Sequence, residues 1–195
     1  MRNASRVAPL VVLVLALLTS CIPYWRETYY APDAPGGVRA RGTCNPSDPE
    51  NILRFSFGES RVSVSAGPYD AGTMFSMVFR LDAGHQASLS QLSLNIQTPG
   101  DPLRMIPISR AERTLRSPYR PISPSDVMNG EFEPNPVRNR PGYTTAFRFS
   151  AQMNERPEQV TVTFPEFVLD GQRFELPPVT FTRAVKHEFL VPINC

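Results

Sequence analysis

Residues 73–82, TMFSMVFRLD, carry large apolar side chains at every second position. Successive side chains of a β-strand point to opposite faces, so this spacing predicts a strand with one face on a hydrophobic core. Ser76 and Arg80 fall on the solvent side of the pattern. The inward set is Phe75, Met77, Phe79 and Leu81. The stretch therefore predicts an antiparallel sheet that is buried on one side.

The same alternation recurs through most of the chain after residue 52. Asp170-Gly171 separates two such stretches and is the strongest hairpin signal in the sequence. About nine or ten short strands with turn residues between them are typical of an all-β protein, and they favour an antiparallel β-sandwich of the immunoglobulin-like class. A β-barrel is the alternative, because alternation does not report whether a sheet closes.

The middle of the chain interrupts the strand pattern. Pro107 makes residues 103–108 fit an edge strand better than a central one. Ser109-Arg110-Ala111-Glu112 matches a capping box, which predicts one or two helical turns over residues 109–116. Residues 117–141 are rich in Pro, Ser, Asn and Gly and are typical of a long irregular loop. We therefore expect one long irregular insertion that contains a short helix.

Arginine is concentrated in this interrupted region, where eight arginines between residues 104 and 148 stand against four carboxylates. On the predicted helix, Arg110, Arg113 and Arg116 share one face, and Tyr119 and Arg120 follow closely. Guanidinium groups pair well with carboxylates and phosphates. These five residues are the candidate binding site for an anionic envelope component or a protein partner. The alternative is a solvated loop whose arginines pair with carboxylates of the sheet.

The N-terminal segment has the form of a secretory signal, with a short basic head, an apolar core over residues 7–18 and small residues before a cleavage point. The core is shorter than the roughly 20 residues of a membrane span, which argues against an anchor that stays attached. Leu18-Thr19-Ser20-Cys21 resembles the lipobox of bacterial lipoproteins. The resemblance implies that the signal is cut before Cys21, whose thiol and new amino group are then acylated.

This resemblance divides the chain into a cleaved signal peptide (1–20), a lipidated tether (21–43) and a single β domain (44–195). Prolines and glycines without an apolar period predict that the tether is irregular. In that family an aspartate after the cysteine favours retention at the inner membrane, whereas this chain has Ile22. We therefore expect an outer-membrane lipoprotein that faces the periplasm and contacts the membrane through its lipid anchor.

Two further cysteines, Cys44 and Cys195, remain after lipidation of Cys21. An exported protein meets an oxidising compartment, so this even remainder predicts one disulfide that closes nearly all of the domain. A metal or redox pair is the alternative, and the lack of a C-x-x-C motif argues against it. The disulfide would fasten the last residue of the chain to the start of the domain.

The charge balance gives no sign of a nucleic-acid partner. The chain has 20 basic and 18 acidic side chains, and loss of Arg2 and Arg6 with the signal would leave the two balanced. A global basic field is therefore missing. The two histidines, His85 and His187, stand far apart in the sequence and predict no metal site.

The sequence also predicts no enzyme and no cofactor, because it has no nucleophile elbow, no H-E-x-x-H and no P-loop. We expect a non-catalytic binding or structural module. The alternative function is a carboxylate-dependent hydrolase of envelope glycan, since two acids of a glycosidase meet only in three dimensions. The candidate acid pairs are Glu131 with Glu133 and Glu166 with Glu175.

Overall fold

The computed structural model describes residues 24–42, 48–81, 85–114, 120–122 and 145–189, and the side chains of 27–42, 48–81, 85–113 and 146–186. Every regular element in these residues is a β-strand, which confirms the all-β prediction. The strands are β1 (Tyr24–Asp33), β2 (Val38–Ala40), β3 (Ile52–Phe57), β4 (Ser60–Tyr69), β5 (Gly72–Leu81), β6 (Ala87–Leu89), β7 (Ser93–Gln97), β8 (Arg104–Thr114), β9 (Arg120–Ile122), β10 (Thr145–Met153), β11 (Gln159–Thr163), β12 (Phe167–Leu169), β13 (Gln172–Phe174) and β14 (Val179–Phe189).

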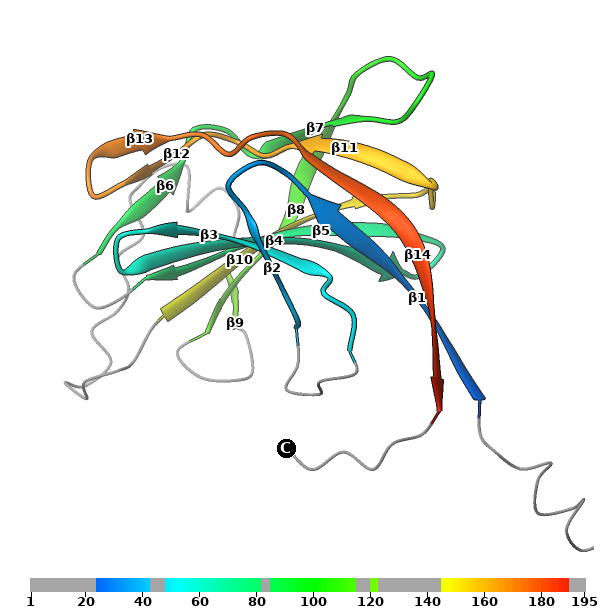
Figure 1. Cartoon of the computed structure of the whole chain (residues 1–195). Helices are drawn as coiled ribbons and strands as arrows, with labels where there is room; N and C mark the ends of the chain where they lie inside the picture. Colours follow the sequence, from blue (N-terminus) through cyan, green and yellow to red (C-terminus); the bar gives the residue numbers. More distant parts are fainter. Residues whose placement is uncertain (1–23, 43–47, 82–84, 115–119, 123–144, 190–195) are drawn as a thin grey trace, which may run out of the picture.

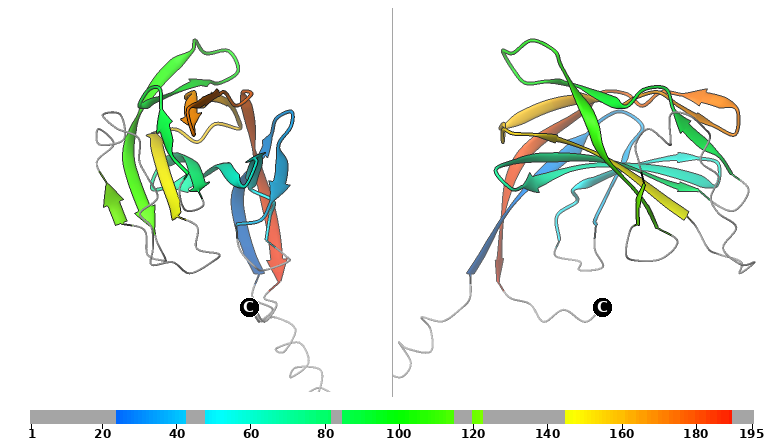
Figure 2. Two further views of the ribbon diagram at one scale, coloured as in Figure 1. Left: turned by 90° about the vertical axis from the view of Figure 1, so that its left-hand side faces the viewer. Right: turned by 180° about the vertical axis from the view of Figure 1, so that it is seen from behind.

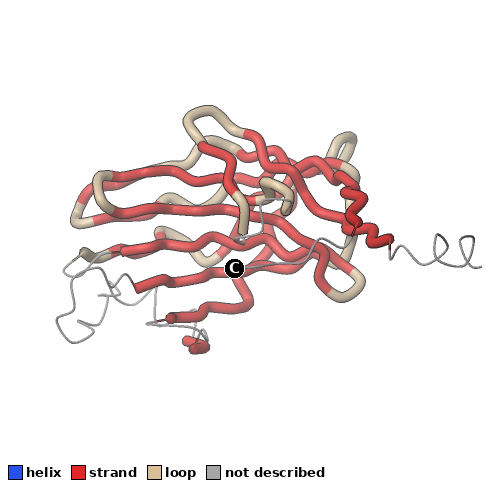
Figure 3. Tube along the Cα trace, turned by 60° about the horizontal axis from the view of Figure 1, so that its bottom comes forward, coloured by secondary structure: helices blue, strands red, loops and turns tan. Residues whose placement is uncertain are grey.

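Most strands belong to one 11-stranded antiparallel sheet, in the order β1-β14-β11-β7-β8-β10-β5-β4-β3-β2, with β9 paired to β8. The two ends of this path, β1 and β2, are consecutive in the chain, and β1 also lies against β3 and β4. The sheet therefore curves until it nearly closes into a barrel (Figure 1). The two-sheet sandwich expected from the sequence is not confirmed. Figure 3 shows the strands side by side with the connections at their ends.

A small three-stranded sheet, in the order β13-β12-β6, lies beside the end of β3. Phe57 from β3 contacts Phe167 of β12 and Phe174 of β13, with ring centroids 5.3 and 4.8 Å apart. The hairpin between β12 and β13 has the predicted two-residue turn, in which Asp170 and Gly171 have φ angles of 51° and 80°. Positive φ at both central residues is the requirement of a type I′ turn.

The interior of the barrel is filled with side chains. The residues predicted to face inward on β5 are all buried, and Phe79 is 0% exposed. Phe79 packs edge-on against Phe149 of β10 and Phe167 of β12, at centroid distances of 6.0 and 5.1 Å. Interlocked aromatic rings of this kind make a packed core. Within the described residues, the barrel therefore encloses a packed core.

The helix predicted over residues 109–116 is wrong as far as the structure describes that stretch. Residues 104–114 form the single strand β8, and its pairing with β10 shifts at Ser109, where Ser150 faces Arg110 but Ala151 faces Ile108. This β-bulge inserts one extra residue. Inward positions are therefore even-numbered before the bulge and odd-numbered after it, so the period of two is lost in the sequence.

The tether predicted over residues 21–43 is also wrong for the part that the structure describes. Tyr24–Asp33 form β1, which pairs with β14 along its whole length, and Val38–Ala40 form β2. The hydroxyl of Tyr30 lies 3.1 Å from Thr73 Oγ1 and donates to the carbonyl of Pro157 at 3.0 Å, which fixes β1 to the body. Pro32 within β1, the prolines on either side of the strand and its position at an end of the sheet path hid this strand.

Beyond β11, β14 pairs with β1 alone. Residues 24–29 and 184–189 form this two-stranded terminal ribbon, in which Tyr24 faces Phe189 and Tyr29 faces Ala184. Figures 1 and 2 show the ribbon running away from the other strands. Several predictions fall outside the described residues: the lipidation site Cys21, the disulfide pair Cys44 and Cys195, and nearly all of the insertion over 117–141. They stay predictions.

Candidate anion-binding face on the outer wall of the sheet

Outward-pointing arginines gather on one wall of the barrel, formed by β3, β4, β5, β10 and β8. The register places their outward residues in cross-strand rows. Among the described side chains on this wall, the acidic residue is Glu112 and the basic residues are five arginines. We call this wall the arginine face; its arginines are Arg54, Arg61, Arg80, Arg110 and Arg148. The outward serines of the arginine face are Ser56, Ser63, Ser65, Ser76 and Ser150.

Arg61 and Arg80 are a like-charged pair at the centre of one row. They lie directly opposite each other on β4 and β5, and both are exposed. Neither guanidinium group has a hydrogen bond or an ion pair in the part of the chain that the structure describes. Like charges directly opposite each other on a sheet are destabilising. An anion held between the two guanidinium groups would remove that repulsion.

Arg110, by contrast, is held by a buried carboxylate. Its Nε donates to Glu112 Oε1 at 2.8 Å. Glu112 is 6% exposed, whereas the Arg110 side chain is 51% exposed. A buried carboxylate is costly unless it is paired, so Glu112 fixes the position of Arg110. Because a guanidinium has five N–H donors, Arg110 keeps donors for a ligand.

The β-bulge shapes a depression at the Arg110 end of the arginine face. The depression has a volume of about 250 Å³ and is open to solvent. Its wall is mostly polar, because β8 and β10 contribute hydroxyl, amide and guanidinium groups to it. Ser150 Oγ in this wall lies 3.1 Å from Ser76 Oγ. The lining includes Tyr69, Met74, Ser109, Arg110, Ser150 and Gln152.

Of the five residues predicted as a binding site, the structure describes the side chains of Arg110 and Arg113 and places them on opposite sides of β8. Arg110 lies on the arginine face, but Arg113 faces Phe147 across the strand pair and so lies on the other side of β8. The shared helical face predicted for these arginines is therefore wrong, because a strand with a bulge replaces the helix. Arg120 pairs with Arg113 through β9, and its side chain lies outside the described set. Arg116 and Tyr119 lie outside the described residues.

Sequence reasoning missed Arg54 and Arg61, and it noted Arg80 only as an outward residue of a strand. Each arginine stands at an outward position of a strand that the alternation predicted. That position was the available signal. It was not sufficient, because the strands that make up the face are scattered along the chain and their order is not visible in the sequence.

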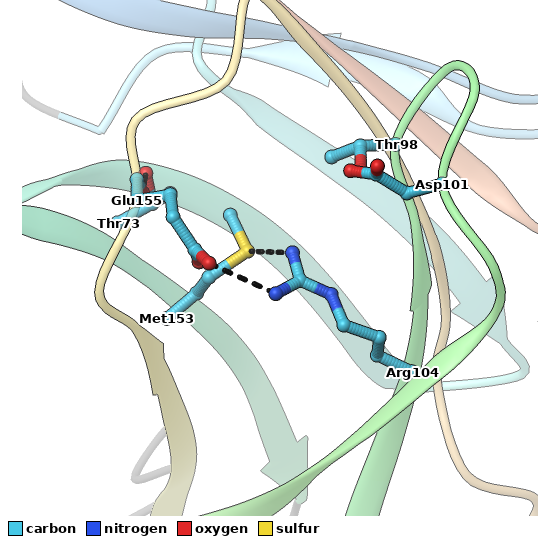
Figure 4. A network of polar contacts seen from close by, with 6 residues as sticks. All are labelled: Thr73, Thr98, Asp101, Arg104, Met153 and Glu155. Atoms are coloured by element: carbon cyan, nitrogen blue, oxygen red, sulfur yellow. Dashed lines mark hydrogen bonds and ion pairs between the residues drawn. The ribbon is translucent and has the colours of Figure 1, made fainter.

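Most described arginines elsewhere on the barrel have carboxylate partners, as Figure 4 shows for Arg104. Arg156 instead donates to the backbone carbonyls of Asp70 and Gly72, and Arg113 has no carboxylate partner within the described residues. Arg104 Nη1 donates to Glu155 Oε1 at 2.9 Å, and its Nη2 lies 3.6 Å from Met153 Sδ. The Glu155 carboxylate raises the pKa of Arg104 above its ordinary value. In the same view Thr98 donates to Asp101 within the turn between β7 and β8. These groups are satisfied locally and offer no anion site.

Of the described candidates for metal binding and hydrolysis, His85 and Glu166 have structural partners, whereas Glu175 is exposed and forms no ion pair within the described residues. His85 Nδ1 lies 2.7 Å from Asp170 Oδ2, and the Gln86 N–H donates to Asp170 Oδ1 at 2.9 Å. The Gln86 N–H and then His85 hold the pKa of Asp170 below its ordinary value. Glu166 forms an ion pair with Arg173 at 3.6 Å. Glu131, Glu133 and the His187 side chain lie outside the described set.

Comparison with known proteins adds no relative. No family model matches the chain, and no curated protein or solved structure matches it either. Within the described residues, no helix is long and apolar enough to cross a bilayer. In the same residues, no cluster of three His, Cys, Asp or Glu side chains is placed to hold a metal ion.

Proposed function

We propose that this chain is a lipid-anchored, non-catalytic binding module of the bacterial cell envelope. It sits at the outer membrane, faces the periplasm and holds an anionic envelope component on the arginine face. The lipobox-like segment ending at Cys21 supports the anchor. The packed interior supports a binding site on the outer wall.

The observation that carries the binding proposal is the Arg61–Arg80 pair. Two exposed guanidinium groups directly opposite each other cost stability, and no described carboxylate offsets that cost. Arg110 lies on the same wall with a position fixed by Glu112. Guanidinium groups form charge-assisted hydrogen bonds with carboxylates and phosphates. An anionic ligand would therefore find several preplaced donors on one wall.

The binding proposal is tested with the double variant Arg61→Ser/Arg80→Ser, which introduces the residue type found at neighbouring outward positions. The protein is purified in detergent, and its affinity for polyphosphate and polygalacturonate is measured over a range of salt concentrations. We expect about a tenfold loss of affinity, because two exposed charge contacts of up to about 1 kcal/mol each are removed. The salt dependence should also become weaker.

The matched control is Arg173→Ser, which removes an exposed arginine from the β12–β13 hairpin, away from the arginine face. It should bind both polymers as the wild type does. Equal losses in the control and in the double variant would show that only net charge matters. A wild type that binds neither polymer would refute the binding proposal.

The anchor is tested separately by mass spectrometry of the wild type and of Cys21→Ser. The wild type should begin at Cys21 and carry acyl chains, whereas the variant should keep residues 1–20 and carry none. More than one acyl chain is expected, because a single chain holds a protein at a membrane only reversibly. An unacylated wild-type protein that begins at another residue would refute the anchor.

A further inference from the structure

The depression beside the bulge differs in chemistry from the rest of the arginine face. Tyr69 is 38% exposed and gives it an aromatic wall. Gln152, Ser109 and Ser150 add amide and hydroxyl groups that both donate and accept hydrogen bonds. Arg110 adds a fixed cation. An aromatic ring, mixed donors and acceptors, and one cation together match a sugar ring that carries hydroxyls and one acidic group.

The size of the depression limits what fits. Its volume of about 250 Å³ is below the roughly 300–1,000 Å³ of pockets for drug-sized ligands. It therefore accommodates one small unit, and the remainder of a longer ligand would lie on the open wall beside it. We propose that the depression is a subsite for one unit of a linear acidic polysaccharide, whose chain continues across the arginine face.

The spacing of the arginines agrees with a linear ligand. Arg80 on β5 and Arg110 on β8 lie two strands apart, with β10 between them. Their partners on β10, Ala146 and Ser150, are four residues apart along that strand. With strands about 4.8 Å apart and a rise of about 3.4 Å per residue, the two positions lie roughly 17 Å apart. A single small anion cannot reach both. A polymer with repeated acidic groups can occupy the depression and the Arg61–Arg80 pair together, which raises its overall affinity.

The composition of the wall argues against a protein as the ligand. Protein interfaces have a centre that is depleted in charged residues and anchored by buried aromatic or apolar side chains. The outward positions of this wall are mainly arginine and serine. The large apolar residues described among them are Val78, Ile52 on β3 and Met74 in the lining of the depression. This wall is suited to a hydrated, polar polymer.

This inference rests on the proposed function, and it is tested with three polyanions that share charge but differ in chemistry. Polygalacturonate has sugar rings with carboxylates, polyglutamate has carboxylates on a peptide, and polyphosphate has neither. The wild type should bind polygalacturonate more tightly than polyglutamate of equal charge. Tyr69→Ala and Gln152→Ala should each lower the affinity for polygalacturonate about fivefold, the effect of losing roughly one contact, and leave polyphosphate binding unchanged.

Two controls keep this test specific. Tyr69→Trp keeps an aromatic wall and should retain polygalacturonate binding. Tyr29→Ala removes a tyrosine from β1, away from the arginine face, and should have no effect on either polymer. Short galacturonate oligomers that reach only the depression should bind more weakly than the polymer.

The outcomes separate this inference from the proposed function. Equal losses for polygalacturonate and polyphosphate in Tyr69→Ala would overturn the sugar subsite while leaving an anion-binding face. Tighter binding of polyglutamate than of polygalacturonate would overturn it in favour of a protein partner. If the wild type binds no polyanion at all, the proposed function itself is wrong.

Discussion

The two outer walls of the barrel differ sharply although they cover one core. The arginine face has Arg61 and Arg80 in its end row, without a side-chain partner among the described residues. The wall formed by β7, β11 and residues 179–182 of β14 instead has uncharged polar side chains at its outward positions. On this second wall Thr161 Oγ1 lies 3.2 Å from Thr180 Oγ1. We call it the threonine wall; its outward residues are Ser93, Asn95, Gln97, Gln159, Thr161, Thr163, Thr180 and Thr182.

The contrast separates a structural surface from a functional one. Threonine is favoured in strands, and its hydroxyl finds a cross-strand partner, so the threonine wall needs no ligand to explain it. The Arg61–Arg80 pair opposes sheet stability within the described structure. Outward positions of a sheet are free of the packing constraints that fix inward ones. A destabilising choice at such positions therefore points to binding.

The largest effect should come from breaking the core that both walls share. Phe79 is fully buried between β10 and β12, so Phe79→Ala should lower the free energy of unfolding by about 3–5 kcal/mol. Denaturant titration measures the loss. Phe174→Ala, in the small sheet and only partly buried, should cost less. Equal costs would mean that the two sheets contribute equally to the core.

A smaller effect of opposite sign should follow from a charge reversal on the arginine face. Arg80→Glu places an opposite charge across from Arg61, so it should raise the free energy of unfolding by about 0.2–1 kcal/mol. The same variant should bind polyanions more weakly than the wild type. Arg80→Gln, which only removes the charge, should lie between the two in both measurements. A less stable Arg80→Glu would contradict the repulsion on which the site rests.

The smallest effect concerns Asp170, whose carboxylate is hydrogen-bonded to His85 and to the Gln86 N–H. The guanidinium groups of Arg61 and Arg80, by contrast, have no partner among the described residues. Because the pKa of folded Asp170 is lowered, its contribution to stability is present near neutral pH and is lost as the pH falls through that lowered pKa. Asp170→Asn keeps the turn conformation but not the charge. Its deficit in unfolding free energy at pH 6 should be small, since the site is largely exposed, and should vanish near pH 2.

The matched control for this pH dependence is Asp70→Asn. Asp70 has a similar φ of 46°, but its carboxylate forms no hydrogen bond or ion pair within the described residues. This variant measures the cost of the Asp→Asn change itself at a turn position of similar φ, and its deficit is subtracted at each pH. A deficit of Asp170→Asn that persists at pH 2 would show that the charge is not its cause.

Local features of the fold could be predicted from the sequence where one strand or turn decides them. The inward set on β5 and the Asp170-Gly171 turn follow from spacing and backbone conformation alone, and both are present. β8 could not be predicted, because the bulge at Ser109 changes the phase of alternation within one strand. The capping-box pattern at that point then resembled a helix start.

Features that depend on the order of strands in the sheet could not be predicted from the sequence. Closure of the sheet depends on β1 and β2 taking the two ends of the strand path, and β1 was hidden by Pro32 and by the prolines that flank it. The arginine face likewise needs β10 to lie between β8 and β5. Arg61 and Arg80 become a pair only through a register of two neighbouring strands, which spacing along the chain does not report.

The terminal ribbon determines how the proposed anchor would transmit mechanical load. β1 begins at Tyr24, so the membrane would pull on the outer end of a ten-residue strand, while β14 is held at its inner end by β11. Hydrogen bonds of an antiparallel pair run perpendicular to the strands. A pull along β1 therefore loads them in shear, all together, whereas peeling would break them one at a time. Under such a pull, the ribbon would resist separation of β1 from the domain with the combined strength of that ladder.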